Sequence, residues 1–197
     1  GYSAALGALR DELLQLASWR IENKDKIIFC YAGNVGEAHN AAFLQELIAQ
    51  LDPEKHLMLL RLYGCKAGNI LNTVHNHPAV FVLDYLPQNE IQYVDVNVAS
   101  LLSDWRHICV PSKVVSAICS GTPVLYNAHR ESDGACMFSE AVWLISDQEN
   151  IPVAVAQFLD RISLEVINMK KKFARKYAGE LLRMEKHNLL RLLDVLK

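Results

Sequence analysis

The sequence contains no apolar run long enough to span a membrane and no segment of the secretory-signal type. A transmembrane helix needs roughly 18–20 consecutive apolar residues, and a signal peptide opens with a basic stretch followed by an apolar one. Neither pattern is present in the 197 residues. With 51% apolar and 21% charged residues, the chain has the composition of a soluble globular protein and is long enough for one full-sized domain.

An excess of basic residues is also lacking. The 20 Lys and Arg residues are balanced by 22 Asp and Glu residues, which leaves a formal net charge of −2. A broad positive field of the kind that attracts nucleic acid is therefore excluded. We expect no nucleic-acid partner.

Paired cysteines are absent as well. The five cysteines are an odd number, are scattered along the chain and form no CxxC pair. This spacing argues against a disulfide framework and against a zinc site. Most of them stand in apolar strand or helix patterns, so we interpret them as reduced, buried thiols of a cytosolic protein.

Apolar segments of two kinds alternate along the chain. Short, nearly continuous apolar runs predict buried strands, and segments with apolar residues every three or four positions predict helices. Such alternation is typical of α/β proteins, in which a Rossmann-like parallel sheet carries helices on both faces. The predicted strands are 26–32, 57–63, 79–83, 95–101, 123–127 and 142–146. The predicted helices are 3–20, 38–51, 67–75, a turn after Pro87, 113–120, 132–140, 152–168 and 170–196.

These elements divide the chain into three parts. Residues 1–25 are expected to form an N-terminal helix, 26–168 a Rossmann-like domain, and 169–197 a C-terminal amphipathic helix. The triple lysine at 170–172 is interpreted as a solvated helix face. Ligands of doubly wound sheets bind at the carboxyl ends of the strands, so the turns at those ends are the first candidates for function.

The first such turn is Gly33-Asn34-Val35-Gly36. Its two glycines permit a close approach of backbone to a ligand, and the helix that follows offers free N–H groups and a partial positive charge. The turn does not match GxGxxG. On periodicity alone, a purely structural turn and a ligand-binding turn remain equally acceptable.

The segment "VPSKVVSAICSGTP" at 110–123 is more informative. Ser112 is a good N-cap residue, and Lys113 follows at the helix start, where a cation is unfavourable against the helix dipole. A lysine is explained there if an anion binds, because the dipole, the N–H groups and the ammonium then act on it together. The alternative is a solvated surface lysine. Arg106 and His107 flank this segment and could reach the same anion.

Four segments together resemble a known family. They are "YAGNVGEAHN", "LRLYGCKAGNI", "VFVLDYLPQNEI" and "DVNVASL…WRHICVPSKVVSAICSGTPVLYNA". In this order and spacing, over about residues 26–150, the chain resembles the C-terminal half of group-1 (family 4) glycosyltransferases, and most of all the colanic-acid-type transferases of polysaccharide biosynthesis. The resemblance implies a GT-B architecture of two Rossmann-like domains with the active site in the cleft between them.

The resemblance also implies where the sugar nucleotide binds. Gly33, Asn34 and Gly36 match the turn that faces the diphosphate, with His39 in the region that usually carries basic residues, and Gly64 matches the turn after the second strand. Tyr85 and Leu86 match the segment that contacts the nucleobase. Pro111, Ser112 and Lys113 match the phosphate loop, with Arg106 beside it. Two departures concern acidic residues: Ile108 and Ser116 stand where many members carry glutamates, so the contact to ribose and the identity of the donor stay open.

The resemblance further implies a donor of the UDP-sugar or GDP-sugar type, no cofactor and no metal. An N-terminal Rossmann-like domain would supply most contacts to a glycan or lipid-linked acceptor and often the general base, so no catalytic residue is assigned here. The chain begins at Gly1 rather than methionine and has about half the length of a GT-B enzyme. We therefore expect the donor-binding half alone, inactive by itself, in the cytoplasm or at the inner face of the membrane. The alternative is a non-catalytic module that binds a nucleotide, a sugar or a partner.

Overall fold

The structure is a computed structural model that describes residues 17–74, 76–84, 86 and 93–195. In these residues a six-stranded sheet is formed in the order β3-β2-β1-β4-β5-β6, and every neighbouring pair is parallel. This is the strand order of the doubly wound Rossmann fold, which confirms the expected fold class. The strands are β1 Ile27–Asn34, β2 His56–Tyr63, β3 Val80–Val82, β4 Val96–Ser100, β5 Val124–Ala128 and β6 Val142–Ser146.

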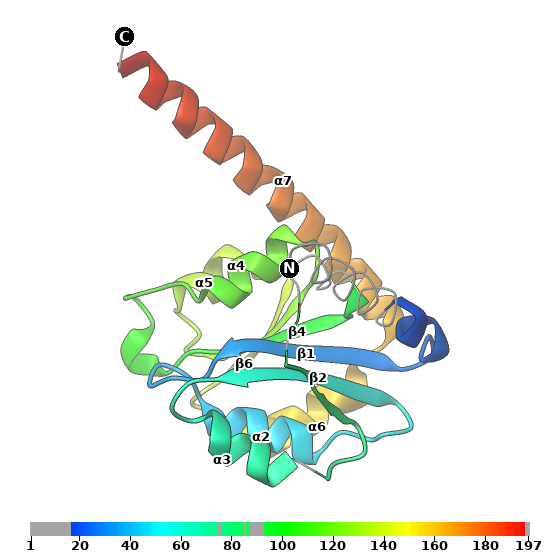
Figure 1. Ribbon diagram of the computed structural model, residues 1–197. Helices are drawn as coiled ribbons and strands as arrows, with labels where there is room; N and C mark the ends of the chain where they lie inside the picture. Colours follow the sequence, from blue (N-terminus) through cyan, green and yellow to red (C-terminus); the bar gives the residue numbers. More distant parts are fainter. Residues whose placement is uncertain (1–16, 75, 85, 87–92, 196–197) are drawn as a thin grey trace, which may run out of the picture.

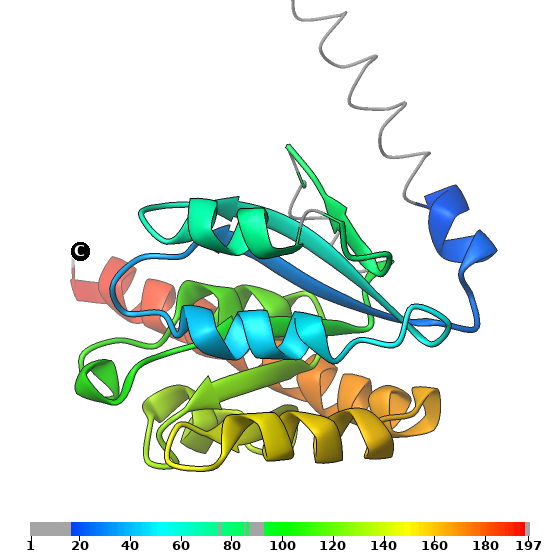
Figure 2. The same ribbon diagram turned by 90° about the horizontal axis from the view of Figure 1, so that it is seen from below.

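Helices cover both faces of the sheet (Figure 1). On one face lie α2 (Ala41–Ala49), α3 (Ala67–Val74) and α6 (Ile151–Arg161), and Figure 2 shows α2 and α6 side by side in front of the sheet. The other face carries α4 (Ser112–Cys119), α5 (Asp133–Met137) and α7 (Leu164–Val195). A short 3₁₀ turn, η2 (Ser103–Trp105), follows β4.

Strand β1 shows why the apolar runs are continuous. Phe29 and Tyr31 belong to the same buried cluster as the apolar residues of α2, whereas Ile28 and Cys30 belong to a second cluster with Leu86. Successive side chains of a strand point to opposite faces, and here both faces are covered. A doubly covered strand therefore needs apolar residues at every position.

The boundary between the last two helices differs from the prediction. Helix α6 ends at Arg161, and α7 begins at Leu164 instead of 170. Ile162 is extended, with φ −72 and ψ 136, and the Ser163 hydroxyl accepts a hydrogen bond from the Val166 N–H at 3.3 Å. This local cap interrupts the helix within an apolar periodicity that continues across it.

The prediction for the cysteines was wrong in one respect. All five are free, but only Cys30 is buried. Cys65, Cys109, Cys119 and Cys136 are exposed, because they lie in loops or on the outer sides of short helices. An apolar sequence context therefore did not imply burial at these positions.

The interpretation of the lysines at 170–172 as a solvated face holds for Lys172, which is exposed, but was wrong for Lys170 and Lys171. The Lys170 Nζ donates to the carbonyls of Glu140 and Val142 at 2.9 and 2.8 Å and lies 5.0 Å from the Trp143 ring centre. Burial lowers the pKa of Lys170. Lys171 forms an ion pair with Asp95 at 3.0 Å. Lys170 and Lys171 therefore bind α7 to the rest of the domain.

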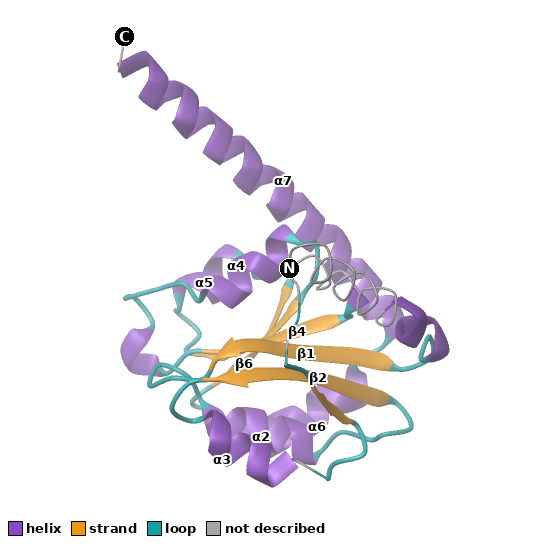
Figure 3. Cartoon of the chain, viewed as in Figure 1, coloured by secondary structure: helices purple, strands orange, loops and turns teal. Residues whose placement is uncertain are grey.

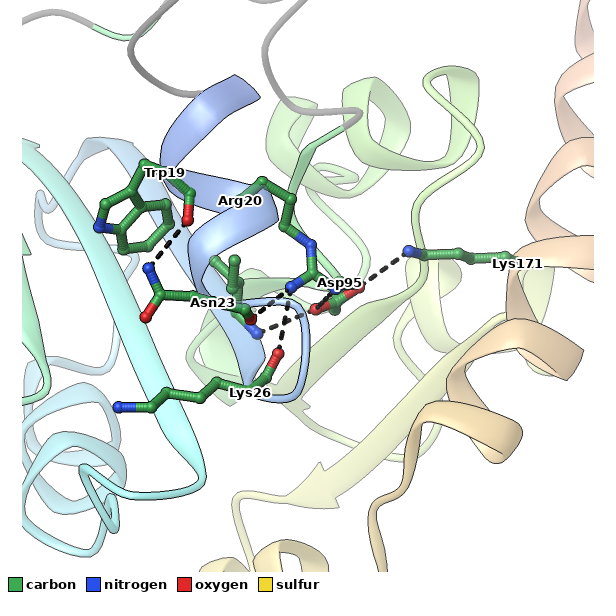
Figure 4. A network of polar contacts seen from close by, with 7 residues as sticks. Trp19, Arg20, Asn23, Lys26, Asp95 and Lys171 are labelled. Atoms are coloured by element: carbon green, nitrogen blue, oxygen red, sulfur yellow. Dashed lines mark hydrogen bonds and ion pairs between the residues drawn. The ribbon is translucent and has the colours of Figure 1, made fainter.

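Asp95 is the centre of a polar network at the amino edge of the sheet (Figure 4). Its side chain is 4% exposed and accepts hydrogen bonds from the Ile28 N–H at 3.0 Å and from Lys171, and it pairs with Arg20 at 3.2 Å. Arg20 lies in the helical turn at 17–22. One buried carboxylate thus joins this helical turn, β1 and α7.

The C-terminal part of α7 projects beyond the body of the domain (Figures 1 and 3). Leu182 and Met184, on this part, are 63% and 61% exposed. In the described part of the chain, no helix combines the length and apolar character that a bilayer crossing demands.

Candidate functional site: the carboxyl edge of strands β1 and β4

The candidate site lies between β1 and β4, where the order of the strands in the sheet reverses. Chain order runs outward from β1 through β2 to β3 on one side, and from β4 through β5 to β6 on the other. The helix that follows β1 covers one face and the helix that follows β4 covers the other, which leaves a crevice at the carboxyl ends of these two strands. A cavity of ≈ 610 Å³ is found there, and it is lined by residues of β1, β2, β4 and α4, of the loop before α4, and by Leu86.

Gly33 at the end of β1 brings the first turn close to α4. Its φ is +130°, a conformation that residues with a side chain rarely adopt. A Cβ built on Gly33 would lie 2.9 Å from Lys113 Cε. A larger residue here would have to adopt an unfavourable φ and displace the end of the Lys113 side chain, and glycine avoids both.

Lys113 reaches back from α4 to the β1 turn. Its Nζ donates to the Asn34 carbonyl at 2.8 Å, lies 3.2 Å from His39 Nε2 and is 5.1 Å from the centre of the Tyr31 ring. Burial lowers the pKa of Lys113 to about 8. The 33–36 turn and Lys113 are thus close together as expected, although Asn34 and Lys113 are 79 positions apart in sequence.

His39 is the second nitrogen group of the site. Its Nδ1 accepts a hydrogen bond from the Gly36 N–H at 3.1 Å. Burial, together with the nearby charges of Lys113 and Lys66, lowers the pKa of His39 to about 4. The imidazole is therefore neutral at physiological pH.

The start of α4 differs slightly from the prediction. Pro111 occupies the N-cap position, and Ser112 is the first helical residue and forms no side-chain cap. The first N–H groups of a helix have no partner within the helix, and the dipole places a partial positive charge at this end. Pro111, Ser112 and Lys113 all line the cavity.

Several lining residues were missed by the sequence reasoning. Arg61 and Tyr63 come from the end of β2, where the guanidinium lies 5.4 Å from the Tyr63 ring centre and Arg61 Nε donates to the Asp84 carbonyl at 3.2 Å. Asn97 on β4 is 8% exposed, and its Nδ2 has no hydrogen-bond partner among the described residues. A polar residue inside the apolar run "DVNVASL" was the signal that could have singled out Asn97.

The residues proposed from the sequence separate into three groups. Gly33, Asn34, His39, Leu86, Pro111, Ser112, Lys113 and Ser116 line the cavity. Gly36, Gly64 and Arg106 do not line it. The Gly36 N–H donates to His39, Gly64 (φ +104°) leaves room for the Asn34 side chain, and Arg106 donates to the Ser103 carbonyl at 3.5 Å. Tyr85 lies outside the described residues. Ile108 is 69% exposed and does not line the cavity.

Comparison with protein-family models gives no match, and no curated protein matches the sequence. Solved structures do match the fold. Sucrose-phosphate synthase from Thermosynechococcus elongatus superimposes with a TM-score of 0.62 at 16% identity, over 93% of this chain and 51% of that one. Anabaena HepE, solved with UDP and glucose, gives 0.63 at 11% identity over 91% and 52%.

A third structure is itself a single domain. The C-terminal domain of the group-1 glycosyl transferase LpcC from Francisella tularensis gives a TM-score of 0.56 at 7% identity, over 82% of this chain and 90% of that one. The chain has the fold of a GT-B glycosyltransferase domain. It spans about half the length of the synthase and of HepE. A shared fold over half of a protein does not assign the activity of the whole protein to this chain.

Proposed function

We propose that this chain is the donor-binding domain of a glycosyltransferase and holds a UDP-sugar or GDP-sugar by its diphosphate. The observation that carries the proposal is the meeting of the Gly33 turn, Lys113 and the start of α4 in one cavity. Glycine backbone, an ammonium group and a helix N-terminus are three features that favour phosphate. HepE, a structure of the same fold, was solved with UDP.

The chemistry of such a transfer depends on the leaving group. Negative charge builds up on the diphosphate as the bond to the sugar breaks, and fixed donors that face this charge lower the barrier. In our proposal the Lys113 ammonium, the His39 Nε2–H and the first N–H groups of α4 supply these donors without a metal ion. Arg61, Tyr63 and Asn97 line the rest of the cavity and would contact the remainder of the donor.

A complete enzyme would require a second domain across the cavity. The similarity to a C-terminal domain of group-1 type, and the coverage of about half of two larger chains, support this arrangement. In the proposal that domain supplies the acceptor contacts for a glycan or lipid-linked substrate, as in the polysaccharide transferases that the sequence resembles.

Calorimetry tests the proposal directly. At pH 7, UDP or GDP should bind this chain, and the corresponding monophosphate should bind more weakly because fewer phosphate oxygens reach Lys113. Lys113→Ala should weaken diphosphate binding by about 1.5–3 kcal/mol, roughly ten- to a hundred-fold. Equal binding of UDP and GDP by this variant and its parent would remove Lys113 from the phosphate site.

One observation favours a second candidate, a binding module without transferase activity. Ser116 lines the cavity at a position where many members of the family carry a glutamate. A serine there leaves the ribose with a weaker hydrogen-bond acceptor than a carboxylate. In the full-length parent protein, nucleotide binding without turnover of any UDP-sugar or GDP-sugar would favour this candidate.

A further inference from the structure

Two hydrogen-bond donors face each other in the cavity. The Nδ1 of His39 accepts from the Gly36 N–H at 3.1 Å, so a neutral imidazole carries its proton on Nε2. That Nε2 lies 3.2 Å from Lys113 Nζ. An ammonium group has donors only, so a charged Lys113 and this histidine tautomer cannot form a hydrogen bond with each other.

Two arrangements resolve this conflict. In the first, Lys113 is a neutral amine. It accepts a hydrogen bond from the His39 Nε2–H and still donates one to the Asn34 carbonyl at 2.8 Å. In the second, Lys113 is an ammonium, and an anion beside the two nitrogens accepts from both. The first suits the empty cavity, and the second suits a cavity that contains phosphate.

The residues around Lys113 favour the same change from a neutral amine to an ammonium when an anion binds. Tyr31 presents its ring to Lys113 from β1, and the Tyr63 hydroxyl, from β2, lies 3.7 Å from a Cβ built on Gly33. Lys66, after β2, pairs with Glu37 and donates to the carbonyl of His39, so it adds positive charge near the imidazole. Among the described residues, no carboxylate forms an ion pair with Lys113. An anionic ligand would supply the opposite charge that the protein does not place beside Lys113.

We infer that in alkaline solution a phosphate-bearing ligand enters this cavity together with up to one proton, which Lys113 takes from solvent as its amine becomes an ammonium. The ligand oxygen then accepts from both Lys113 and the Nε2–H of His39. This inference rests on the proposed function, because it concerns the same diphosphate site. The lowering of the Lys113 pKa to about 8 by burial agrees with it.

The number of protons taken up on binding can be calculated and measured. If the ligand returns the pKa of Lys113 from about 8 to its ordinary value, binding at pH 8.5 takes up roughly three-quarters of a proton, and almost none at pH 7. Affinity should fall by roughly three- to four-fold between pH 7 and pH 8.5. The terminal phosphate of UDP has a pKa near 6 and stays ionised in this range, which also lies below the pH at which uracil and guanine lose their ring N–H protons.

The experiment is titration calorimetry of this chain with UDP and with GDP, in magnesium-free buffers of equal pH and different ionisation enthalpy. The dependence of the heat on the buffer gives the protons taken up. Lys113→Arg is the decisive variant, since arginine stays charged throughout: its affinity should change little from pH 7 to 8.5, without proton uptake. Cys109→Ser, which removes a thiol from the cavity lining, should keep the uptake.

The outcomes separate the two proposals. Binding without proton uptake in the unaltered chain, or uptake that persists in Lys113→Arg, overturns the inference and leaves the proposed function intact. No binding of either nucleotide at pH 7 overturns both. A second readout does not depend on the variant: nitrogen NMR should show the His39 proton on Nε2, and titration of the lysine side-chain amine should show the Lys113 pKa rising when UDP is added.

Discussion

Lys171 and Asp95 lie 3.0 Å apart although 76 residues separate them in sequence. The contact joins α7 to the strand that enters the candidate site, because Asp95 immediately precedes β4. Arg20 completes the network from the N-terminal side (Figure 4). The position of β4, and of the loop that leads from it to Lys113, therefore depends partly on a salt bridge at the opposite edge of the sheet.

Removing the Asp95 carboxylate should destabilise the domain strongly. Asp95→Ala leaves the partly buried cations of Arg20 and Lys171 without their partner, and breaking a buried pair in this way costs about 3–5 kcal/mol. Urea unfolding measures the loss. Arg130→Ala breaks the exposed pair with Glu149 and should cost no more than about 1 kcal/mol. Equal effects of the two substitutions would contradict the structural role given to Asp95.

Gly33 should be sensitive to any side chain. Gly33→Ala forces a positive φ on alanine and places its Cβ against Lys113 Cε, so we expect a loss of stability of the order of 1–3 kcal/mol. Gly33→Val should in addition reduce nucleotide binding. Gly68→Ala is the matched control, since a Cβ there meets nothing within 4 Å and the residue lies in α3. That control should be neutral or should gain up to about 1 kcal/mol.

Lys113→Met should affect stability in the opposite direction from binding. Because the folded pKa of Lys113 is below its unfolded value, the unfolded chain binds more protons between about pH 8 and the ordinary lysine pKa, and stability rises with pH across that window. The variant should therefore be as stable as its parent or more stable at pH 7, and any advantage should shrink above pH 8. Unfolding curves at pH 7 and 9.5 measure both effects. A variant that is clearly less stable at pH 7 would mean that Lys113 serves the fold.

Acid should destabilise the domain through His39. Its folded pKa of about 4 lies below the ordinary value, so the unfolded state binds more protons and stability falls as the pH is lowered from about 6.5 towards 4. His39→Gln should reduce this loss. His56 should account for part of what remains, because burial lowers its pKa too. Urea midpoints at pH 7 and 4.5 check this, and an unchanged acid sensitivity in His39→Gln would place the titration elsewhere.

Local pattern alone determined the alternation of strands and helices, and with it the parallel sheet. The apolar run of β1 and the helix signals that follow it act over a few residues, and burial on both faces leaves a continuous apolar strand. Since parallel strands end at one edge, the Gly33 turn and the start of α4 could be expected together. A lysine at that helix start opposes the helix dipole, which is why the sequence alone suggested the anion-binding hypothesis for Lys113.

The tertiary structure decided everything that depends on contacts between distant segments. Asp95, Lys171 and Arg20 look like ordinary charged residues in sequence, and only the packing of α7 and the first helical turn against β4 makes them a buried network. Arg61 and Asn97 became cavity residues for the same reason, since the register between strands is set by pairing across the whole sheet. The positions of Gly36 and Lys113 around the His39 ring set its tautomer and bring the Nε2–H to face the Lys113 ammonium. Periodicity along the chain contains no information about that geometry.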